Sequence, residues 1–247
     1  MKKLITIISL LILAGTVSAS LVGSWNLNGN FNNDLGGKSA LVLHGSSSTS
    51  FITDTIAGSS AQVLSFPAFP GGYTDYVGMP NDSGLNTCTN YTLVMDVKFP
   101  TLANYSALWD YGNVTADGDF FVHLNGIGVL GAYSGTFNDD TWYRIAVVCS
   151  YDGANIDMRK YIDGTFVGAQ DDLDAARFSV YNELRLFVDN DGETAAGLMN
   201  SLAFWDETKD DAFISSLGAA SASGIAVPEP ASVILILAAL AGLMIRK

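Results

Sequence analysis

Acidic side chains in one short stretch are the main candidates for binding chemistry in this sequence. Asp189, Asp191 and Glu193 belong to the run Asp-Asn-Asp-Gly-Glu, in which Asn and Gly favour a turn. Carboxylate oxygens on a turn suit Ca²⁺, which prefers hard oxygen ligands. The run lacks the ligand spacing and the final Glu of an EF-hand loop, so solvated turn aspartates are the competing explanation. Calcium at Asp189, Asp191 and Glu193 is therefore a hypothesis, and it is the only cofactor that the sequence suggests.

The other reactive side chains form no catalytic pattern. His44 and His123 are far apart in the sequence, and each lies in a strand-like stretch where a structural role is the simpler explanation. The sequence has no Gly-x-Ser-x-Gly turn and no Cys/His cluster with zinc spacing. No pair of carboxylates is singled out for glycoside hydrolysis. We therefore predict that the protein is not an enzyme.

Two cysteines, Cys88 and Cys149, are present. In an exported protein, such a pair favours one disulfide, because disulfides persist in oxidising compartments. Two buried free thiols are the alternative, since Cys149 lies inside a predicted strand. The sequence therefore favours a Cys88–Cys149 bridge and leaves the alternative open.

The elements that must position these residues are predicted to be short β-strands. Alternating or apolar runs recur between turn clusters, as in sandwiches and barrels, and Asn125-Gly126 and Asp163-Gly164 indicate hairpin turns. One helix is expected over 208–217, capped by Asp206 or Thr208 and closed by Gly218. The expected strands are 21–27, 40–44, 62–66, 91–99, 120–124, 127–131, 142–150, 155–162, 165–168, 184–188 and 197–205.

The N-terminal 19 residues have the three regions of a secretory signal peptide. Met1-Lys2-Lys3 is cationic, an apolar run extends from Leu4 to Gly15, and Val17-Ser18-Ala19 is a small-x-small cleavage site. The apolar run is short for a membrane anchor. We expect cleavage between Ala19 and Ser20, and hence export of the protein.

The C-terminal residues form a second processing signal. Val227-Pro228-Glu229-Pro230 cannot be helical. The 15 residues of 231–245, which are apolar except for Ser232 and are followed by Arg246 and Lys247, span only about 22 Å as a helix. That is short of the ~30 Å hydrocarbon core of a bilayer. The three parts together resemble the PEP-CTERM sorting signal of Gram-negative bacteria. The resemblance implies a transient helix in the inner membrane, cleavage by an exosortase, and delivery to the cell surface or polysaccharide matrix; a permanent anchor is the alternative.

The region between the two signals is strongly acidic. Four of the 12 Lys and Arg and one of the 25 Asp and Glu lie in the ends, so residues 20–226 carry a net charge of about −16. Such a charge argues against nucleic acid as a partner, because phosphates would be repelled.

Three stretches in this region have the order and spacing of a known domain. They are 75–100, with a Ser-Gly-Leu turn before an alternating strand, 141–168, with a Trp-led strand and Tyr-Ile-Asp-Gly, and 197–218, a strand followed by a short helix. Together they resemble the LamG-like domain. The resemblance implies an all-β, two-sheet antiparallel jelly-roll sandwich of the concanavalin A-like type over 20–218. A flexible, small-residue linker is expected at 219–226.

Function is less constrained by the sequence than fold is. Trp25, Trp142 and Trp205 are expected in the core rather than as sugar platforms. The favoured hypothesis is a non-catalytic surface or matrix module that binds glycan or protein. A structural matrix protein without a specific ligand and a divergent glycosidase are the alternatives. The first two differ in whether Tyr73, Tyr76, Tyr105 and Tyr133 form an exposed cluster.

Overall fold

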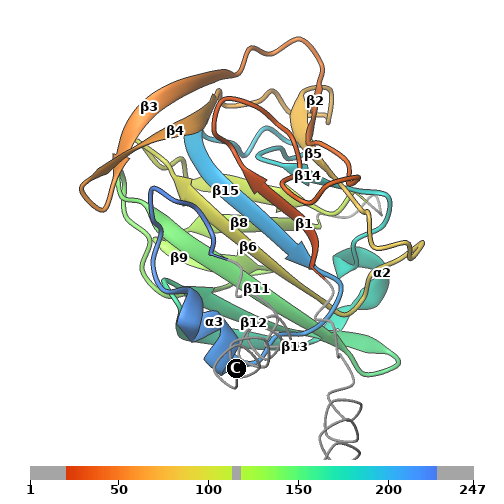
Figure 1. Cartoon of the computed structure of the whole chain (residues 1–247). Helices are drawn as coiled ribbons and strands as arrows, with labels where there is room; N and C mark the ends of the chain where they lie inside the picture. Colours follow the sequence, from red (N-terminus) through yellow and green to blue (C-terminus); the bar gives the residue numbers. More distant parts are fainter. Residues whose placement is uncertain (1–20, 113–117, 227–247) are drawn as a thin grey trace, which may run out of the picture. The chain divides into compact units, whose positions relative to one another are not determined.

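Two antiparallel β-sheets form the framework of the protein in its computed structural model, which describes residues 21–112 and 118–226 (Figure 1). The eight-stranded sheet has the order β13 (Thr165–Asp174), β12 (Asn155–Ile162), β11 (Tyr143–Tyr151), β6 (Tyr91–Lys98), β15 (Gly197–Trp205), β4 (Ser59–Phe66) and β3 (Ser50–Ile56), with β1 (Leu21–Asn26) also paired to β15. The seven-stranded sheet has the order β10 (Ala132–Ser134), β9 (Gly126–Val129), β8 (Asp119–His123), β7 (Tyr105–Asp110), β14 (Glu183–Leu186), β5 (Tyr76–Pro80) and β2 (Val42–His44). The predicted all-β architecture of two antiparallel sheets is therefore confirmed.

Several strand predictions change at their ends. The hairpin turn between β8 and β9 is Leu124-Asn125, with φ of 49° and 60°, rather than Asn125-Gly126. A second turn at Leu130-Gly131 follows β9, so the expected strand 127–131 instead spans Gly126–Val129. The Asp163-Gly164 turn between β12 and β13 is confirmed.

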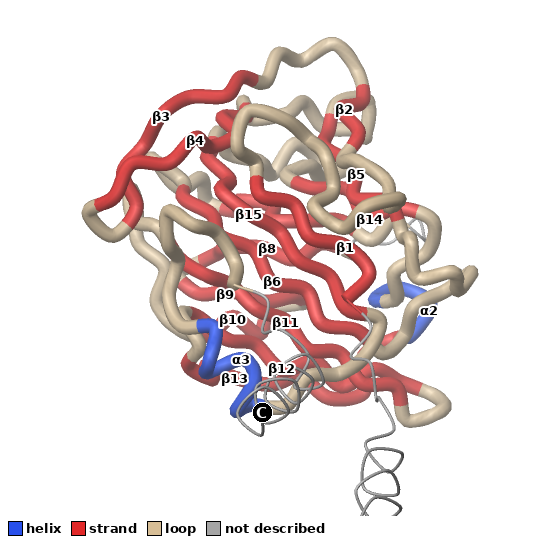
Figure 2. Tube along the Cα trace, in the orientation of Figure 1, coloured by secondary structure: helices blue, strands red, loops and turns tan. Residues whose placement is uncertain are grey.

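In the part of the chain that the structure describes, the helices beside the sheets are short (Figure 2). Helix α3 (Asp211–Leu217) is the predicted one, closed by Gly218 as expected; Asp210 caps it, not Asp206 or Thr208, by accepting a hydrogen bond from the Phe213 N–H. Helix α2 (Ala175–Phe178) was not predicted. Within the described residues, no helix is long and apolar enough to span a membrane. The signal peptide, its Ala19–Ser20 cleavage point, the sorting signal and the hydrophobic helix 231–245 lie outside the described residues.

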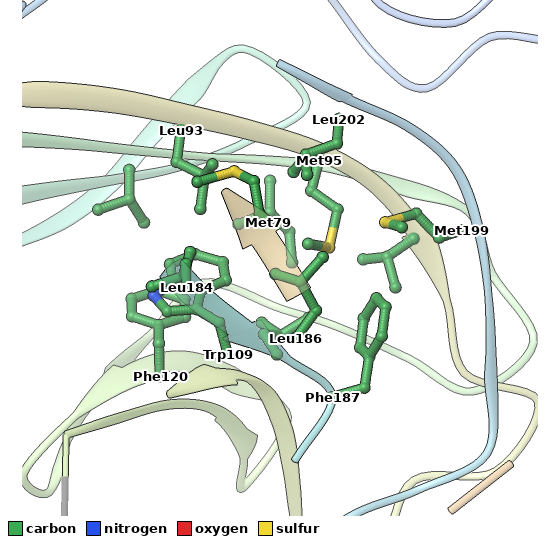
Figure 3. Packing of buried hydrophobic residues seen from close by; sticks show 14 of the residues in the cluster. Met79, Leu93, Met95, Trp109, Phe120, Leu184, Leu186, Phe187, Met199 and Leu202 are labelled. Atoms are coloured by element: carbon green, nitrogen blue, oxygen red, sulfur yellow. The ribbon is translucent and has the colours of Figure 1, made fainter. Parts of the chain in front are cut away.

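The core lies between the sheets and explains the central strands. All of β15 and all but the last residue of β6 are buried, because both faces of these strands are covered. In Figure 3, Leu93, Met95 and Leu202 from the eight-stranded sheet face Leu184, Leu186, Trp109 and Phe120 from the other sheet. Trp25 and Trp205 are buried as predicted. Trp142 is only half-buried, because it precedes β11 and donates its indole N–H to Asp54.

A buried ion pair fastens the C-terminal part of the domain to the eight-stranded sheet. The Arg144 guanidinium meets the Asp96 carboxylate at 2.6 Å and 2.7 Å, and it also donates to the main-chain oxygens of Leu217 and Gly224. Ala220 and Ile225 are buried as well. The flexible linker predicted at 219–226 is therefore wrong: this segment has no regular structure but is packed, so the folded unit extends from Leu21 to Ala226.

Both cysteines are free, buried thiols, so the predicted Cys88–Cys149 bridge is not formed in the structure. Cys88 lies in a backbone bridge to Val180, and its Sγ contacts the main-chain oxygen of Asn90 at 3.2 Å. Cys149 belongs to β11 and packs in the core. Burial raises the pKa of each thiol to about 12, which keeps both protonated and unreactive.

Candidate functional site

The seven-stranded sheet has one face in the core and one face turned away from it, here called the outer face. Strand β14 shows the alternation: Leu184 and Leu186 enter the core, whereas Glu183 and Arg185 lie on the outer face. A bulge in β7 after Ala107 restores the outward direction for Asp110. The outer face carries His44, Tyr76, Glu183, Arg185, Asp110, Asp119, Tyr105, Phe121 and His123, and Tyr73 and Tyr133 adjoin it.

One end of the outer face is aromatic. Tyr105 and His123 lie opposite each other on β7 and β8, with ring centroids 3.7 Å apart and planes 2° apart. Phe121 and Tyr133 contact them edge-on, and together these four residues form the Tyr105 cluster. A hollow of about 640 Å³ adjoins it, lined by polar residues that include Asn104, His123, Asn125, Asn138 and Asp139.

The other end carries the Tyr76 cluster of Tyr76, His44 and Glu183. The rings of Tyr76 and His44 stack with centroids 4.3 Å apart. The Tyr76 hydroxyl donates to Glu183 Oε1 at 2.9 Å, and His44 Nε2 lies 3.0 Å from Glu183 Oε2. Burial, followed by the nearby Glu183 carboxylate, raises the pKa of Tyr76, so the hydroxyl remains a proton donor. The Glu183 carboxylate therefore contacts both rings of the stack.

A charged row lies on the same face as the two clusters. Arg185, Asp110 and Asp119 lie side by side on β14, β7 and β8. Arg185 Nη1 is 3.6 Å from Asp110 Oδ1, and its guanidinium lies 4.4 Å from the centroid of the Tyr73 ring. Tyr73 adopts a φ of 58°, uncommon for a non-glycine residue, and its hydroxyl donates to Asp110 Oδ2. Burial raises the pKa of Asp110 above its usual value, although Asp119, Arg185 and Tyr73 act in the opposite direction.

This arrangement suits a sugar polymer better than a single sugar. Aromatic rings present apolar surface, while the polar row offers hydrogen-bond donors and acceptors in fixed positions. Across the sheet, Tyr105 on β7 and Tyr76 on β5 are two strand spacings apart, or about 10 Å, and His123 on β8 and His44 on β2 are four spacings apart, or about 19 Å. A ligand that contacts both clusters must therefore be longer than one sugar residue.

The three residues predicted to bind calcium do not gather as ligands. Across residues 21–112 and 118–226, no three Asp, Glu, His or Cys side chains are grouped so that they could hold a metal ion. Asp189 is buried, and its Oδ2 accepts hydrogen bonds from the main-chain N–H groups of Asp191 and Glu193 at 2.8 Å and 3.1 Å. The structure thus gives Asp189 a role in closing its own turn, which is the competing explanation, and calcium at Asp189, Asp191 and Glu193 stays a hypothesis.

Sequence reasoning found part of the outer face. The four tyrosines considered as candidates for an exposed cluster all lie on or beside the outer face. They form two groups: Tyr73 and Tyr76 lie near Arg185, and Tyr105 lies with Tyr133. The two histidines do lie on strands, but each stacks on a tyrosine of this face. Asp110, Asp119 and Arg185 were missed as a group, because only strand pairing brings them together.

Comparisons with known proteins identify the fold and no family. No family model matches the chain, and no curated protein matches it. Among solved structures, domain 4 of AbnA, a GH43 extracellular arabinanase from Geobacillus stearothermophilus in complex with arabinotriose, is similar with a TM-score of 0.57 and 13% identity, over 81% of this chain and 98% of that domain.

Two further structures are similar over part of their length. The botulinum neurotoxin type G receptor binding domain has a TM-score of 0.53 and 12% identity, over 80% of this chain and 50% of that one. Trypanosoma rangeli sialidase has a TM-score of 0.53 and 12% identity, over 81% of this chain and 32% of that one. At these identities the likeness shows fold alone: the protein is a two-sheet β-sandwich.

Proposed function

We propose that the protein is a non-catalytic carbohydrate-binding module that holds an extended glycan on the outer face of its seven-stranded sheet. One observation carries the proposal: two partly exposed aromatic clusters lie on the same sheet face, together with a row of polar groups. Packing of the core between the sheets does not require these stacked rings, because they lie on the face turned away from it. The structural likeness to a domain solved with arabinotriose supports a sugar ligand by analogy of fold.

Charge limits the class of glycan. Arg185 is the only Lys or Arg among the residues assigned to the outer face, and Asp110 already faces it at 3.6 Å. The surrounding chain is strongly acidic, so an anionic polymer would be repelled. The proposed ligand is therefore a neutral oligosaccharide or polysaccharide.

The carboxylates of the outer face support binding rather than hydrolysis. Asp110, which pairs with Asp119 across β7 and β8, is engaged by the Tyr73 hydroxyl and lies 3.6 Å from Arg185. Glu183 is engaged by both Tyr76 and His44. Sugars released from a bound oligosaccharide during prolonged incubation would instead favour the divergent glycosidase.

A glycan array of neutral and acidic oligosaccharides tests the proposal, probed with the full chain in Ca²⁺ and in EDTA. We expect neutral chains to bind equally in both buffers. Tyr105→Ala and Tyr76→Ala should each weaken binding by roughly tenfold or more, since truncating a central aromatic contact commonly costs over 1 kcal/mol. Tyr151→Ala is the matched control, because Tyr151 is an exposed tyrosine on the other sheet. Absence of any glycan binding would favour the structural matrix protein.

We also propose that the chain is exported and then sorted to the cell surface or extracellular polysaccharide. The proposal rests on the signal peptide 1–19 and on Val227–Pro230 with its apolar segment and terminal Arg246 and Lys247. An exosortase-type enzyme would hold the chain briefly at the inner membrane and remove the tail. Deleting residues 227–230 should leave the protein in the membrane fraction; unchanged release would contradict sorting.

A further inference from the structure

A second polar hollow, of about 430 Å³, lies on the eight-stranded sheet, and we propose that it is a separate binding site for one neutral sugar residue. The hollow, here called the amide hollow, is formed by β1, β3, β4, β15 and the C-terminal segment. It shares no residue with the outer face of the seven-stranded sheet. The site itself does not depend on the proposed function, but together the two sites would let one molecule bridge two glycans.

Four primary amides meet at the amide hollow from distant parts of the chain. Asn26 ends β1 and Asn28 follows it, Gln62 belongs to β4, and Asn200 belongs to β15. Every residue that lines the hollow is uncharged. Folding therefore gathers groups that can each donate and accept hydrogen bonds, without any fixed charge.

These amides keep most of their hydrogen-bonding capacity free. Asn200 is 4% exposed; its Nδ2 donates to the main-chain oxygen of Ser221 at 2.8 Å, whereas its Oδ1 accepts no hydrogen bond from a described residue. The side-chain amides of Asn26, Asn28 and Gln62 likewise form no hydrogen bond with any described residue. Amide groups that are open to solvent are hydrated, and the hydroxyl groups of a ligand can replace that water.

Two glycines allow the backbone to pass close to the amides. Gly224 has a φ of 75°, and a Cβ there would lie 2.0 Å from Asn26 Oδ1. Gly29 has a φ of 82°, and a Cβ there would lie 2.8 Å from Gln62 Oε1. The backbone can approach the amides this closely only because these residues lack side chains. Since Arg144 also binds the Gly224 oxygen, the wall of the hollow is fixed before a ligand arrives.

The chemistry of the lining selects the ligand. A sugar hydroxyl both donates and accepts, so adjacent hydroxyls match the N–H and C=O of a primary amide. Leu27, Ala61 and Ala222 supply apolar wall for the C–H groups of the ring. The volume lies at the small end of the usual range for ligand pockets, and a charged ligand would find no counterion.

Side-chain amide signals in NMR spectra of the full chain provide a direct test. The probes are glucose, galactose and N-acetylglucosamine, with glucuronic acid as the charged comparison. At least one neutral probe should shift the signals of Asn26, Gln62 or Asn200, and glucuronic acid should not. Gln62→Ala and Asn28→Ala, both at exposed positions, should each weaken that binding by roughly tenfold.

Two controls separate this site from the outer face. Asn182→Ala removes an exposed amide elsewhere and should leave the affinity unchanged, as should Tyr105→Ala. The proposal is overturned if no neutral probe shifts these amide signals, or if both hollow variants bind as tightly as the wild type. Loss of the shifts in Tyr105→Ala would also overturn it, because the sugar would then occupy the outer face.

Discussion

Replacing Arg144 with methionine should destabilise the protein more than any surface substitution. Asp96 is fully buried and would keep only Ser201 as a side-chain hydrogen-bond partner. Removing one member of a buried ion pair typically costs about 3–5 kcal/mol, because the remaining charge has lost its partner. The main-chain oxygen of Leu217 would also lose its donor, whereas that of Gly224 would keep the Ser221 hydroxyl. A domain of ordinary stability has roughly 5–15 kcal/mol in total, so the loss should be large but measurable.

Urea unfolding followed by tryptophan fluorescence measures this loss directly. The matched control is Arg159→Met, since the Arg159–Asp211 pair is exposed and should contribute about 1 kcal/mol or less. The double variant Asp96→Leu/Arg144→Met should recover part of the stability, because no buried charge is left unpaired. Limited proteolysis should cut the Arg144→Met variant within residues 219–226 faster than the wild type. Equal losses for Arg144→Met and Arg159→Met would refute the reasoning.

Three further predictions follow from buried groups. Lys160 is 1% exposed and donates to Ala132 and Gln170, and burial lowers its pKa to about 8. Between pH 8 and about pH 10.5 the unfolded chain then binds more protons than the folded one, so the free energy of unfolding should rise with pH. The rise should reach roughly 3 kcal/mol relative to the Lys160→Met variant. Equal dependence of the free energy of unfolding on pH in the wild type and in Lys160→Met would contradict this. A thiol reagent should modify neither cysteine in the native protein and both after unfolding, and rapid native labelling would exclude buried thiols. The melting temperature should be equal in millimolar Ca²⁺ and in EDTA, since Asp189 is occupied by its own turn; a clear rise with Ca²⁺ would support the calcium hypothesis.

The sequence predicts those strands whose pattern of polar and apolar side chains reflects which faces are buried. The bounds of β12 and β15 agree with prediction, because β15 is apolar on both faces and Asp163-Gly164 is a clear turn after β12. Strands β3 and β7 were not predicted, since their runs mix polar residues with apolar ones and lack a clean alternation. The packed segment 219–226 has the composition of a linker. Its attachment to the sheet depends on the hydrogen bond from the buried Arg144 to the Gly224 oxygen, which composition does not show.

The candidate sites depend on contacts between distant residues, which composition and periodicity cannot show. Asp110 faces Arg185 only because β7 pairs with β14, and the amides of Asn26 and Asn200 meet only through strand pairing around β15. The sequence identifies the tyrosines as candidate ligand-binding residues. It does not predict their division between two clusters, because that division depends on the strand order of the sheet.

The central claim is that an extended neutral glycan lies across both aromatic clusters of the outer face. Isothermal titration of the full chain with neutral oligosaccharides of increasing length tests it most directly, using the series that binds best on the array. We predict that affinity rises with length until the ligand spans both clusters, and that Tyr76→Ala removes this gain while leaving the binding of short oligosaccharides unchanged. Affinity that is independent of length, or unaffected by both Tyr105→Ala and Tyr76→Ala, would contradict the account.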